Sequence, residues 1–221
     1  MKICIVIPIY NEAGAIGTVV ESVKRKGLQV VVVDDGSNDG SGPIAQGKGA
    51  HVLRLEGRHG KGFALERGFE YAIEKGFDGV ITMDGDGQHS SEDLIKFQDE
   101  AQRNPNTVIN GNRIANAKNM PLVRYLTNRF MSSLISWACR QRVPDTQCGY
   151  RYIGCDVLKA INLVSTGFEI ETEILIQASR KGFKILSVPI ATIYGEEESK
   201  IHPFKDTIRF LKYFIKAVFE K

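Results

Sequence analysis

Five short apolar runs, mostly of β-branched residues, recur along the first 112 residues of this 221-residue chain, and stretches with helical periodicity separate them. A run that is apolar throughout predicts a strand covered on both faces, as in a parallel sheet flanked by helices. The runs are ICIVIPI (3–9), VVVVD (30–34), HVLRL (51–55), GVITMD (79–84) and TVIN (107–110). We therefore expect a doubly wound α/β unit with right-handed crossover helices at about 12–26, 39–48, 62–75 and 91–103.

The pattern changes after Arg113, where a loop precedes a longer helical stretch. Neither an internal repeat nor a low-complexity segment divides the chain, so we interpret the remainder as the second half of the same domain. Its expected elements are a helix over 121–142, a strand near 148–153, helices near 154–162 and 169–181, and a strand near 184–193.

Composition is that of a soluble globular protein, with 43% apolar and 25% charged residues. No apolar run approaches the roughly 18 residues that cross a bilayer, and the first residues lack the cleavage region of a signal peptide. We therefore expect a cytoplasmic chain that does not span a membrane. The four cysteines show neither a CxxC pair nor metal-finger spacing, which predicts buried reduced thiols.

Positive charge gathers in two zones. Residues 200–221 hold six Lys or Arg against two Asp or Glu, and residues 113–144 hold basic residues and no acid. Such zones indicate a polyanionic partner, which could be a phosphorylated ligand, an anionic membrane surface or nucleic acid. Nucleic acid is the weakest of the three, because the zones lack interleaved aromatic residues and a helix-turn-helix pattern.

Polar residues follow the first, second and fourth apolar runs, in the sequences PIYNE, DDGS and DGDGQH. Ligands of open α/β sheets bind beyond the carboxyl ends of the strands, so these residues are the first candidates for a site. Gly85 and Gly87 allow the chain to turn so that Asp84, Asp86 and Gln88 converge. Hard oxygen ligands of this kind suit Mg²⁺ or Mn²⁺, with further positions left for water and phosphate oxygens.

Three other α/β sites do not fit. A receiver domain places its acid pair after the first strand and ends about 100 residues earlier. A dinucleotide site needs GxGxxG after the first strand, where this chain has bulky residues. The GKG sequence at 60–62 lacks the spacing and the Ser or Thr of a Walker phosphate loop.

Taken together, the motifs resemble those of the inverting family 2 glycosyltransferases, within them the dolichyl-phosphate mannose synthase and polyprenyl-phosphate glucosyltransferase branch. The resemblance implies a GT-A fold, a nucleoside diphosphate sugar donor of the GDP-mannose or UDP-glucose type, a divalent cation and a polyprenyl phosphate acceptor. It rests on an ordered set of sequences, namely PIYNE, VVDDGS, GKG with ALERGFEYA, MDGDGQH, GNR at 111–113, DTQCGYR at 145–151 and GEEESKI.

On the donor side, the resemblance puts a set of substrate-binding residues around the nucleoside. Asp84 and Asp86 would face the ribose and the diphosphate that the metal bridges, and Gln88 would complete the metal shell. The residues placed around the base and ribose are Pro8, Tyr10, Glu12 and Asp35, with Lys61 nearby.

On the acceptor side, Arg113 and Arg124 match arginines that would hold the acceptor phosphate, and Ser132 is a further candidate for that site. Asp145 lies where the family has an active-site acid. With Asp86, these two arginines and Asp145 form the expected catalytic set. The mannose synthases carry a Lys where this chain has 167–169 and an Arg shortly before GESK, and Lys200 could supply a replacement charge.

We expect a single domain with three parts: a nucleotide-sugar-binding half (1–112), an acceptor half (113–199) and an amphipathic C-terminal helix (200–221). In the last part an apolar stripe runs beside a basic one, which is typical of a helix at a membrane interface. The expected location is the cytoplasmic face of the membrane, as a peripheral protein. Packing of the apolar stripe on the core is the alternative.

Two other functions remain open at this stage. In one, the sugar passes to a hydroxyl of a saccharide or lipid, and Asp145 becomes the catalytic base. In the other, the chain is a catalytically silent module that binds a sugar nucleotide or a membrane. An already ionised phosphate acceptor needs no strong base, so in the favoured reaction Asp145 would orient the sugar.

Overall fold

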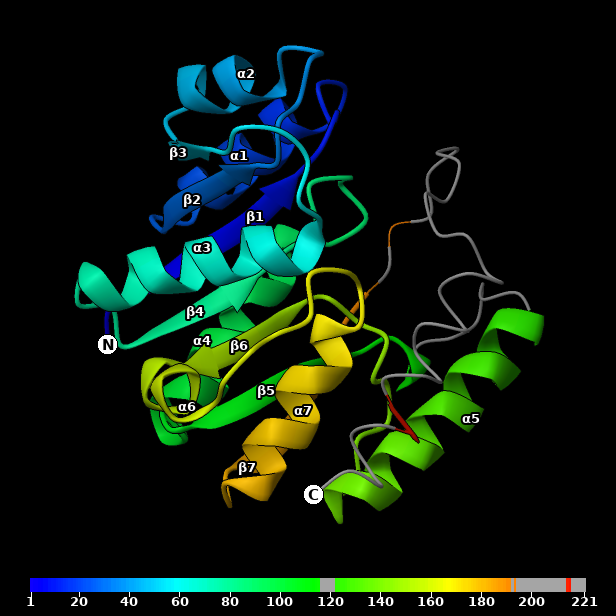
Figure 1. Cartoon of the computed structure of the whole chain (residues 1–221). Helices are drawn as coiled ribbons and strands as arrows, with labels where there is room; N and C mark the ends of the chain where they lie inside the picture. Colours follow the sequence, from blue (N-terminus) through cyan, green and yellow to red (C-terminus); the bar gives the residue numbers. More distant parts are fainter. Residues whose placement is uncertain (116–121, 192, 194–213, 216–221) are drawn as a thin grey trace.

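The computed structural model describes residues 1–115, 122–191, 193 and 214–215, and within these it leaves the Arg124 side chain undescribed (Figure 1). Of the C-terminal segment predicted to be an amphipathic helix, only Phe214 and Ile215 are described. Phe214 is buried, whereas Ile215, which belongs to the predicted apolar stripe, is 55% exposed. The rest of that prediction, Lys200 included, lies outside the described residues.

A seven-stranded sheet crosses the described part of the chain in the order β3-β2-β1-β4-β6-β5-β7. Only β6 runs antiparallel to its neighbours, β4 and β5, and every other pair is parallel. The strands are β1 (Ile3–Ile9), β2 (Gln29–Asp34), β3 (His51–Arg54), β4 (Gly79–Thr82), β5 (Thr107–Asn112), β6 (Arg151–Gly154) and β7 (Lys184–Pro189).

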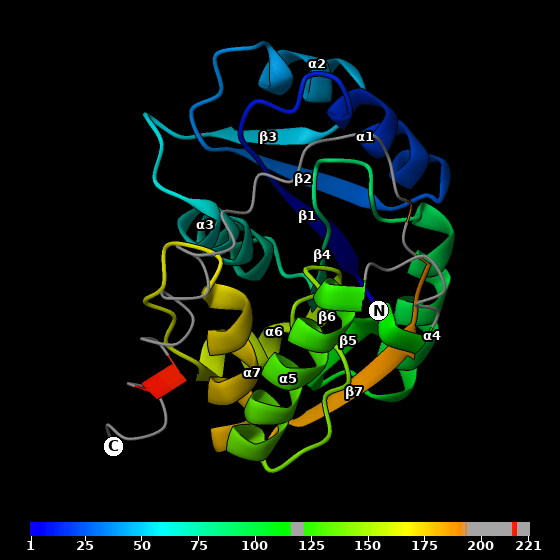
Figure 2. The same ribbon diagram turned by 90° about the vertical axis from the view of Figure 1, so that its right-hand side faces the viewer.

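Helices cover both faces of the sheet, as the apolar runs predict (Figures 1 and 2). Alternate residues of β1 divide between two cores: Val6 belongs to the core that includes residues of α3, α5, α6 and α7, whereas Ile5 belongs to the core that includes residues of α1, α2 and α4. The helices are α1 (Ile16–Arg25), α2 (Ser41–Gly47), α3 (Lys61–Glu74), the 3₁₀ turn η1 (Ser91–Asp93), α4 (Leu94–Arg103), α5 (Leu122–Cys139), α6 (Cys155–Ala160) and α7 (Ile170–Arg180).

The elements predicted up to residue 193 are all present, with shifted ends. The first helix begins at Ile16 rather than near residue 12, because residues 11–15 form a turn that starts with Asn11 at a φ of 54°. The fourth strand ends at Thr82, before the glycine-rich turn. The antiparallel direction of β6 was not anticipated. The fold class is confirmed: a mostly parallel sheet flanked by helices.

Two simpler expectations concern the cysteines and membrane spans. All four cysteines are free and buried, as predicted. Within the described ranges, no helix combines the length and the apolar character that crossing a bilayer requires. Helix α5 lies at the margin of the molecule, on the right in Figure 1, and packs against α7.

Candidate active site

The carboxyl ends of β1, β2 and β4 meet at one edge of the sheet, because the three strands are parallel neighbours. Ile9 lies opposite Asp34, and Val6 lies opposite Thr82. The loops that follow these strands carry the PIYNE, DDGS and DGDGQH sequences. The predicted gathering of polar side chains at this edge is therefore present.

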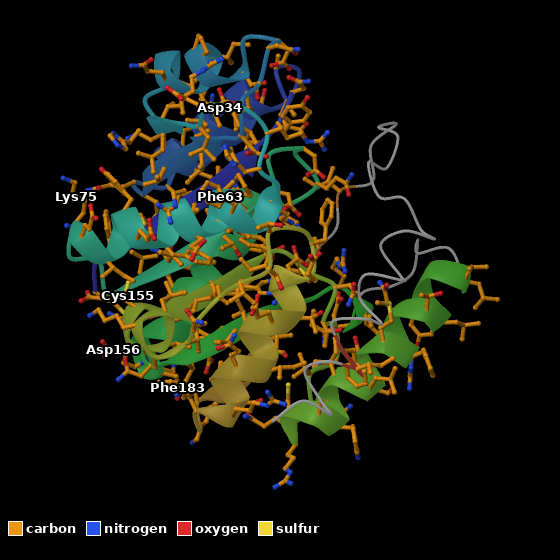
Figure 3. The ribbon with its side chains drawn as sticks, viewed as in Figure 1. Asp34, Phe63, Lys75, Cys155, Asp156 and Phe183 are labelled. Atoms are coloured by element: carbon orange, nitrogen blue, oxygen red, sulfur yellow. The ribbon has the colours of Figure 1, made fainter. Side chains whose placement is uncertain are left out.

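The two acids of the DDGS sequence hold the surrounding loops. Asp34, at the end of β2 (Figure 3), is fully buried, and its carboxylate accepts a hydrogen bond from the Ser37 backbone N–H at 2.8 Å. Asp35 is 4% exposed, and its two oxygens accept from the backbone N–H groups of His59 and Gly60, each at 2.8 Å. Asp35, predicted near the nucleoside, thus fixes the loop that leads into α3.

The PIYNE loop is tied to the same region. The Asn11 N–H donates to Ser37 Oγ at 3.0 Å, and the Glu12 N–H donates to Ser41 Oγ at 2.8 Å. The Arg58 guanidinium lies over the Tyr10 ring, 4.2 Å from its centroid. Tyr10 and Glu12 are partly exposed at the loop surface, as residues that contact a nucleoside would have to be.

Residues from both halves of the chain line a small cavity at the end of β4. Lys61 Nζ donates to Asp84 Oδ1 at 2.6 Å and to Glu171 Oε1 at 2.7 Å. Burial lowers the pKa of Lys61, but Asp84 and Glu171 outweigh burial and raise it. Burial raises the pKa of Asp84, but Lys61 outweighs it and brings that pKa well below its usual range. The residues lining the cavity include Pro8, Lys61, Asp84, Gly149, Arg151 and Glu171.

The DGDGQH turn folds back onto a buried histidine. The Asp84 N–H donates to His89 Nδ1 at 3.2 Å, so the ring proton lies on Nε2, which is 3.7 Å from Asp84 Oδ2. Burial lowers the pKa of His89 and outweighs the opposing charges of Asp84 and Asp86. The Gln88 N–H donates to Asp86 Oδ1 at 2.9 Å.

The turn needs its glycines. Gly87 has a φ of 79°, and a Cβ on Gly85 would lie 2.7 Å from the Ile9 side chain. Gly85 and Gly87 therefore permit the turn between Asp84 and Gln88, and the convergence of these side chains on a cation stays a prediction.

Asp84 and Asp86 suit a divalent cation only if other groups supply its remaining ligands. Within the described ranges, no three His, Cys, Asp or Glu side chains gather into a self-sufficient metal site. Asp84 and Asp86 do offer carboxylate oxygens at one turn, and the Lys61 ammonium already holds a positive charge against Asp84. This set fits a cation that takes its remaining ligands from water and phosphate oxygens.

A buried ion pair follows β5. Arg113 Nε donates to Asp145 Oδ2 at 2.8 Å, Arg113 Nη2 donates to Asp145 Oδ1 at 2.9 Å, and the Arg113 backbone N–H adds a bond of 3.0 Å. Asp145 is fully buried and Arg113 is 9% exposed. Burial lowers the pKa of Arg113, but the charges of Cys148 and Asp145 and the hydrogen bond to Asp145 raise it overall.

Ser132 belongs to the support of this pair. It is 3% exposed on α5, and its Oγ accepts from the Thr146 backbone N–H at 2.9 Å. Ser132 thereby fixes the start of the DTQCGYR loop to the helix that also carries Arg124. The structure places Arg124 on the first turn of α5 but does not describe its side chain.

Two residues of this site were not predicted. Arg151 is 1% exposed, and its guanidinium donates to the backbone oxygens of Thr146, Cys148 and Glu171. Glu171 lies in the first turn of α7 with Glu173, whose carboxylate accepts from the Ser165 N–H at 2.9 Å. Two acids in the first turn of a helix are explained by the helix dipole, so the contact of Glu171 with Lys61 was not anticipated.

Solved structures identify the fold. One similar structure is glucosyl-3-phosphoglycerate synthase from Mycobacterium tuberculosis in complex with Mg²⁺ and UDP. It superposes with a TM-score of 0.73 at 16% identity, and the match covers 98% of this chain and 79% of that chain. In the complex with Mn²⁺, UDP and phosphoglyceric acid the TM-score is 0.71 at 18% identity, covering 76% of that chain. The fold is therefore of the GT-A type.

The sequence comparison is more specific, since residues 4–161 match the profile described as glycosyl transferase family 2. The chain belongs to this family. It is 33% identical to the undecaprenyl-phosphate mannosyltransferase of Micrococcus luteus over 222 residues, covering 91% of this chain and 88% of the relative. It is 31% identical to the dolichyl-phosphate hexose transferase of Haloferax volcanii over 223 residues, covering 99% and 95%. The family and the branch indicated by the motifs are thereby confirmed.

Proposed function

We propose that this enzyme transfers a hexose from a nucleoside diphosphate sugar to a polyprenyl phosphate, with inversion at the anomeric carbon and with a divalent cation. The names of the mannosyltransferase and the hexose transferase support the acceptor class. The donor would be of the GDP-mannose or UDP-glucose type. In the reaction, a phosphate oxygen of the acceptor forms the new bond to the anomeric carbon, and the bond from that carbon to the nucleoside diphosphate breaks.

The choice of acceptor rests on one observation, the hydrogen bonding and burial of Asp145. Both of its oxygens accept hydrogen bonds from the Arg113 guanidinium, and the residue is fully buried. A hydroxyl acceptor needs a base to take its proton, and Asp145 would have to leave this pair to serve. A phosphate acceptor is already ionised near neutral pH and needs no such base. The geometry therefore favours phosphate over hydroxyl.

Arg113 is suited to hold the acceptor phosphate. A guanidinium has five N–H donors, of which two donate to Asp145 here, and three remain on the other edges. Arginine binds phosphate with directed, charge-assisted hydrogen bonds. Arg124 would add a second guanidinium from α5. Ser132 would act indirectly, by fixing α5 to the loop that bears Asp145.

On the donor side, we assign the cation to Asp84, Asp86 and Gln88, as Mg²⁺ or Mn²⁺. A bound cation would stabilise the negative charge that develops on the leaving diphosphate. Tyr10 and Glu12 would contact the base and ribose, while the buried Asp35 would hold the loop at 59–60 beneath them. Pro8 and Lys61 line the adjoining cavity, and Lys200 stays a candidate contact to the phosphates.

Helix α5 supports a peripheral contact with the membrane. Five of its large apolar side chains are between 56% and 78% exposed, which is unusual for a helix of a soluble domain. The helix also lies in the basic zone and carries Arg124, so a bilayer contact here would bring the acceptor phosphate to the site. The exposed apolar residues are Leu122, Val123, Leu126, Phe130 and Trp137. The cytoplasmic face remains part of this proposal.

A donor and acceptor screen tests the function. Purified protein with Mg²⁺ or Mn²⁺ is mixed with a short-chain polyprenyl phosphate and with GDP-mannose, UDP-glucose or a UDP-hexosamine, and release of the nucleoside diphosphate is measured. We expect release with one donor class that depends on the acceptor phosphate. Equal release with the corresponding polyprenol would instead support a hydroxyl acceptor and a role for Asp145 as base.

A further inference from the structure

One ammonium group joins three elements in the middle of the site. Lys61 at the start of α3 contacts Asp84 after β4 and Glu171 on the first turn of α7, at 2.6 and 2.7 Å. The side chains of Lys61, Asp84 and Glu171 are 16%, 29% and 13% exposed. Glu171 has no role in the function proposed above, yet it shares the Lys61 charge with an expected metal ligand.

The backbone beneath Lys61 is held from two directions. Asp35 accepts from the Gly60 N–H, and the Gly62 N–H donates to the Thr166 carbonyl at 2.8 Å. A Cβ on Gly60 or Gly62 would collide with the Thr166 carbonyl or its neighbours. The base of the lysine is therefore fixed, and only its four-carbon side chain has freedom to carry the ammonium between partners.

The two carboxylates are anchored differently. Arg151 anchors Glu171 through two contacts. Its Nη1 donates to the Glu171 backbone oxygen, and its Nη2 lies 3.8 Å from Glu171 Oε2. Asp84 is more exposed and belongs to the turn that also presents Asp86. An incoming cation would meet Asp84 first, because Glu171 is the more buried of the two.

We propose that the Lys61 ammonium is a built-in counter-ion that occupies Asp84 until the divalent cation arrives, and that Glu171 retains the ammonium when Asp84 turns to the cation. The proposal rests on the cation site assigned above. It gives the buried carboxylates a partner at all times, which matters because an unpaired buried charge is costly. Lys61 and Glu171 are thus positioning residues for the cation.

Mn²⁺ titration of the nucleotide-free protein, followed by electron paramagnetic resonance, tests the exchange without any turnover. Lys61→Met removes the competitor at nearly equal length, and we expect Mn²⁺ to bind about tenfold more tightly. Glu171→Gln leaves the ammonium with Asp84 as its charged partner, and we expect binding about tenfold weaker. Opposite effects from two contacting residues are not what a merely structural role would produce.

The double variant Lys61→Met, Glu171→Gln removes one charge of each sign and so leaves the local net charge unchanged. It therefore distinguishes competition by the Lys61 ammonium from an effect of net charge on Mn²⁺ affinity. Direct competition predicts tighter binding than in the parent, because Asp84 is unblocked. Affinity equal to the parent's would mean that only the local net charge matters and would overturn the proposal, as would unchanged or weaker binding by Lys61→Met. Thermal unfolding of each variant confirms that folded protein is titrated.

A further control distinguishes failure of the exchange from failure of the proposed function. Asp86→Asn in the same titration should weaken Mn²⁺ binding, since it removes a ligand charge but leaves the contact between Lys61 and Asp84. Weakened binding there with no effect of Lys61→Met refutes the exchange alone. A parent that binds no Mn²⁺ either alone or with a nucleoside diphosphate, or an unaffected Asp86→Asn variant, refutes the cation site and the exchange with it.

Discussion

The guanidinium of Arg113 and the carboxylate of Asp145 form a buried two-point pair, with Nε to Oδ2 at 2.8 Å and Nη2 to Oδ1 at 2.9 Å. The two residues lie 32 positions apart in the sequence, one after β5 and the other in the DTQCGYR loop. The pair orients the guanidinium and occupies the acid. In the proposed reaction, Arg113 is thus a fixed cationic group for the acceptor phosphate, in place of a mobile base.

Asp145→Asn should therefore act on stability and acceptor binding together. The change leaves Arg113 buried without its counter-charge, which we expect to cost about 3–5 kcal/mol of unfolding free energy. Denaturant unfolding measures that loss, and acceptor titration should show a raised apparent KM. Adding Arg113→Met should recover part of the stability without recovering acceptor binding. A parental stability combined with loss of one ionisation from the pH-rate profile would identify Asp145 as a base.

Asp86→Asn should retain the fold and lose most of the activity. An amide offers an oxygen without the charge that attracts a divalent cation, so turnover should fall by at least about tenfold at fixed Mg²⁺. Raising the metal concentration should restore part of the rate. Steady-state kinetics across a metal titration give the answer, and parental rates at low Mg²⁺ would contradict the metal assignment.

Arg124→Ala separates the acceptor from the donor. Arg124 lies on α5 and not in the loops after β1, β2 and β4 that bear the acids proposed to bind the donor, so its loss should raise the acceptor KM or lower kcat. Nucleoside diphosphate affinity, measured by calorimetry, should stay within about threefold of the parent. A large loss of nucleotide affinity with unchanged acceptor kinetics would refute this division of the site.

Trp137, the only tryptophan of the chain, reports directly on the membrane contact proposed for α5. It is 67% exposed, so transfer to an anionic bilayer should shift its emission to shorter wavelength. Phe130→Ser should weaken vesicle binding, whereas Ile95→Ser, an equally exposed apolar residue on the opposite face of the sheet, should not. Full-length protein should also bind better than a chain ending at Pro203. Equal binding by all of these variants would remove the membrane role.

Burial of Cys148 predicts a loss of stability at alkaline pH. Burial raises the pKa of this thiol from its ordinary value of 9.0 to about 12. Since the folded-state pKa is the higher one, its contribution is fully present below the unfolded pKa and is lost as the pH rises toward 12. Unfolding free energy should therefore fall less steeply above pH 9 in Cys148→Ala. An identical slope in both proteins would contradict this.

The strands and the acid-lined edge were predictable, because each apolar run and the polar residues after it are local in the sequence. The direction of β6 was not, since the run near 148–153 has the same apolar character in either orientation. The partners of Lys61 and Arg113 could not be predicted either. Lys61 meets Glu171 across 110 residues, and the segment that leads into α7 is held to the GKG sequence by the bond from the Gly62 N–H to the Thr166 carbonyl oxygen.

The acceptor group is the central claim, and product analysis tests it most directly. The enzyme is incubated with its preferred sugar nucleotide and an equimolar mixture of a short-chain polyprenyl phosphate and the matching polyprenol, and the lipid products are resolved by mass spectrometry and ³¹P and ¹H NMR. We predict a single hexosyl polyprenyl phosphate, with a new sugar–phosphate linkage and the anomeric configuration opposite to that of the donor. Formation of a hexosyl polyprenol, or retention of the donor configuration, would contradict the account.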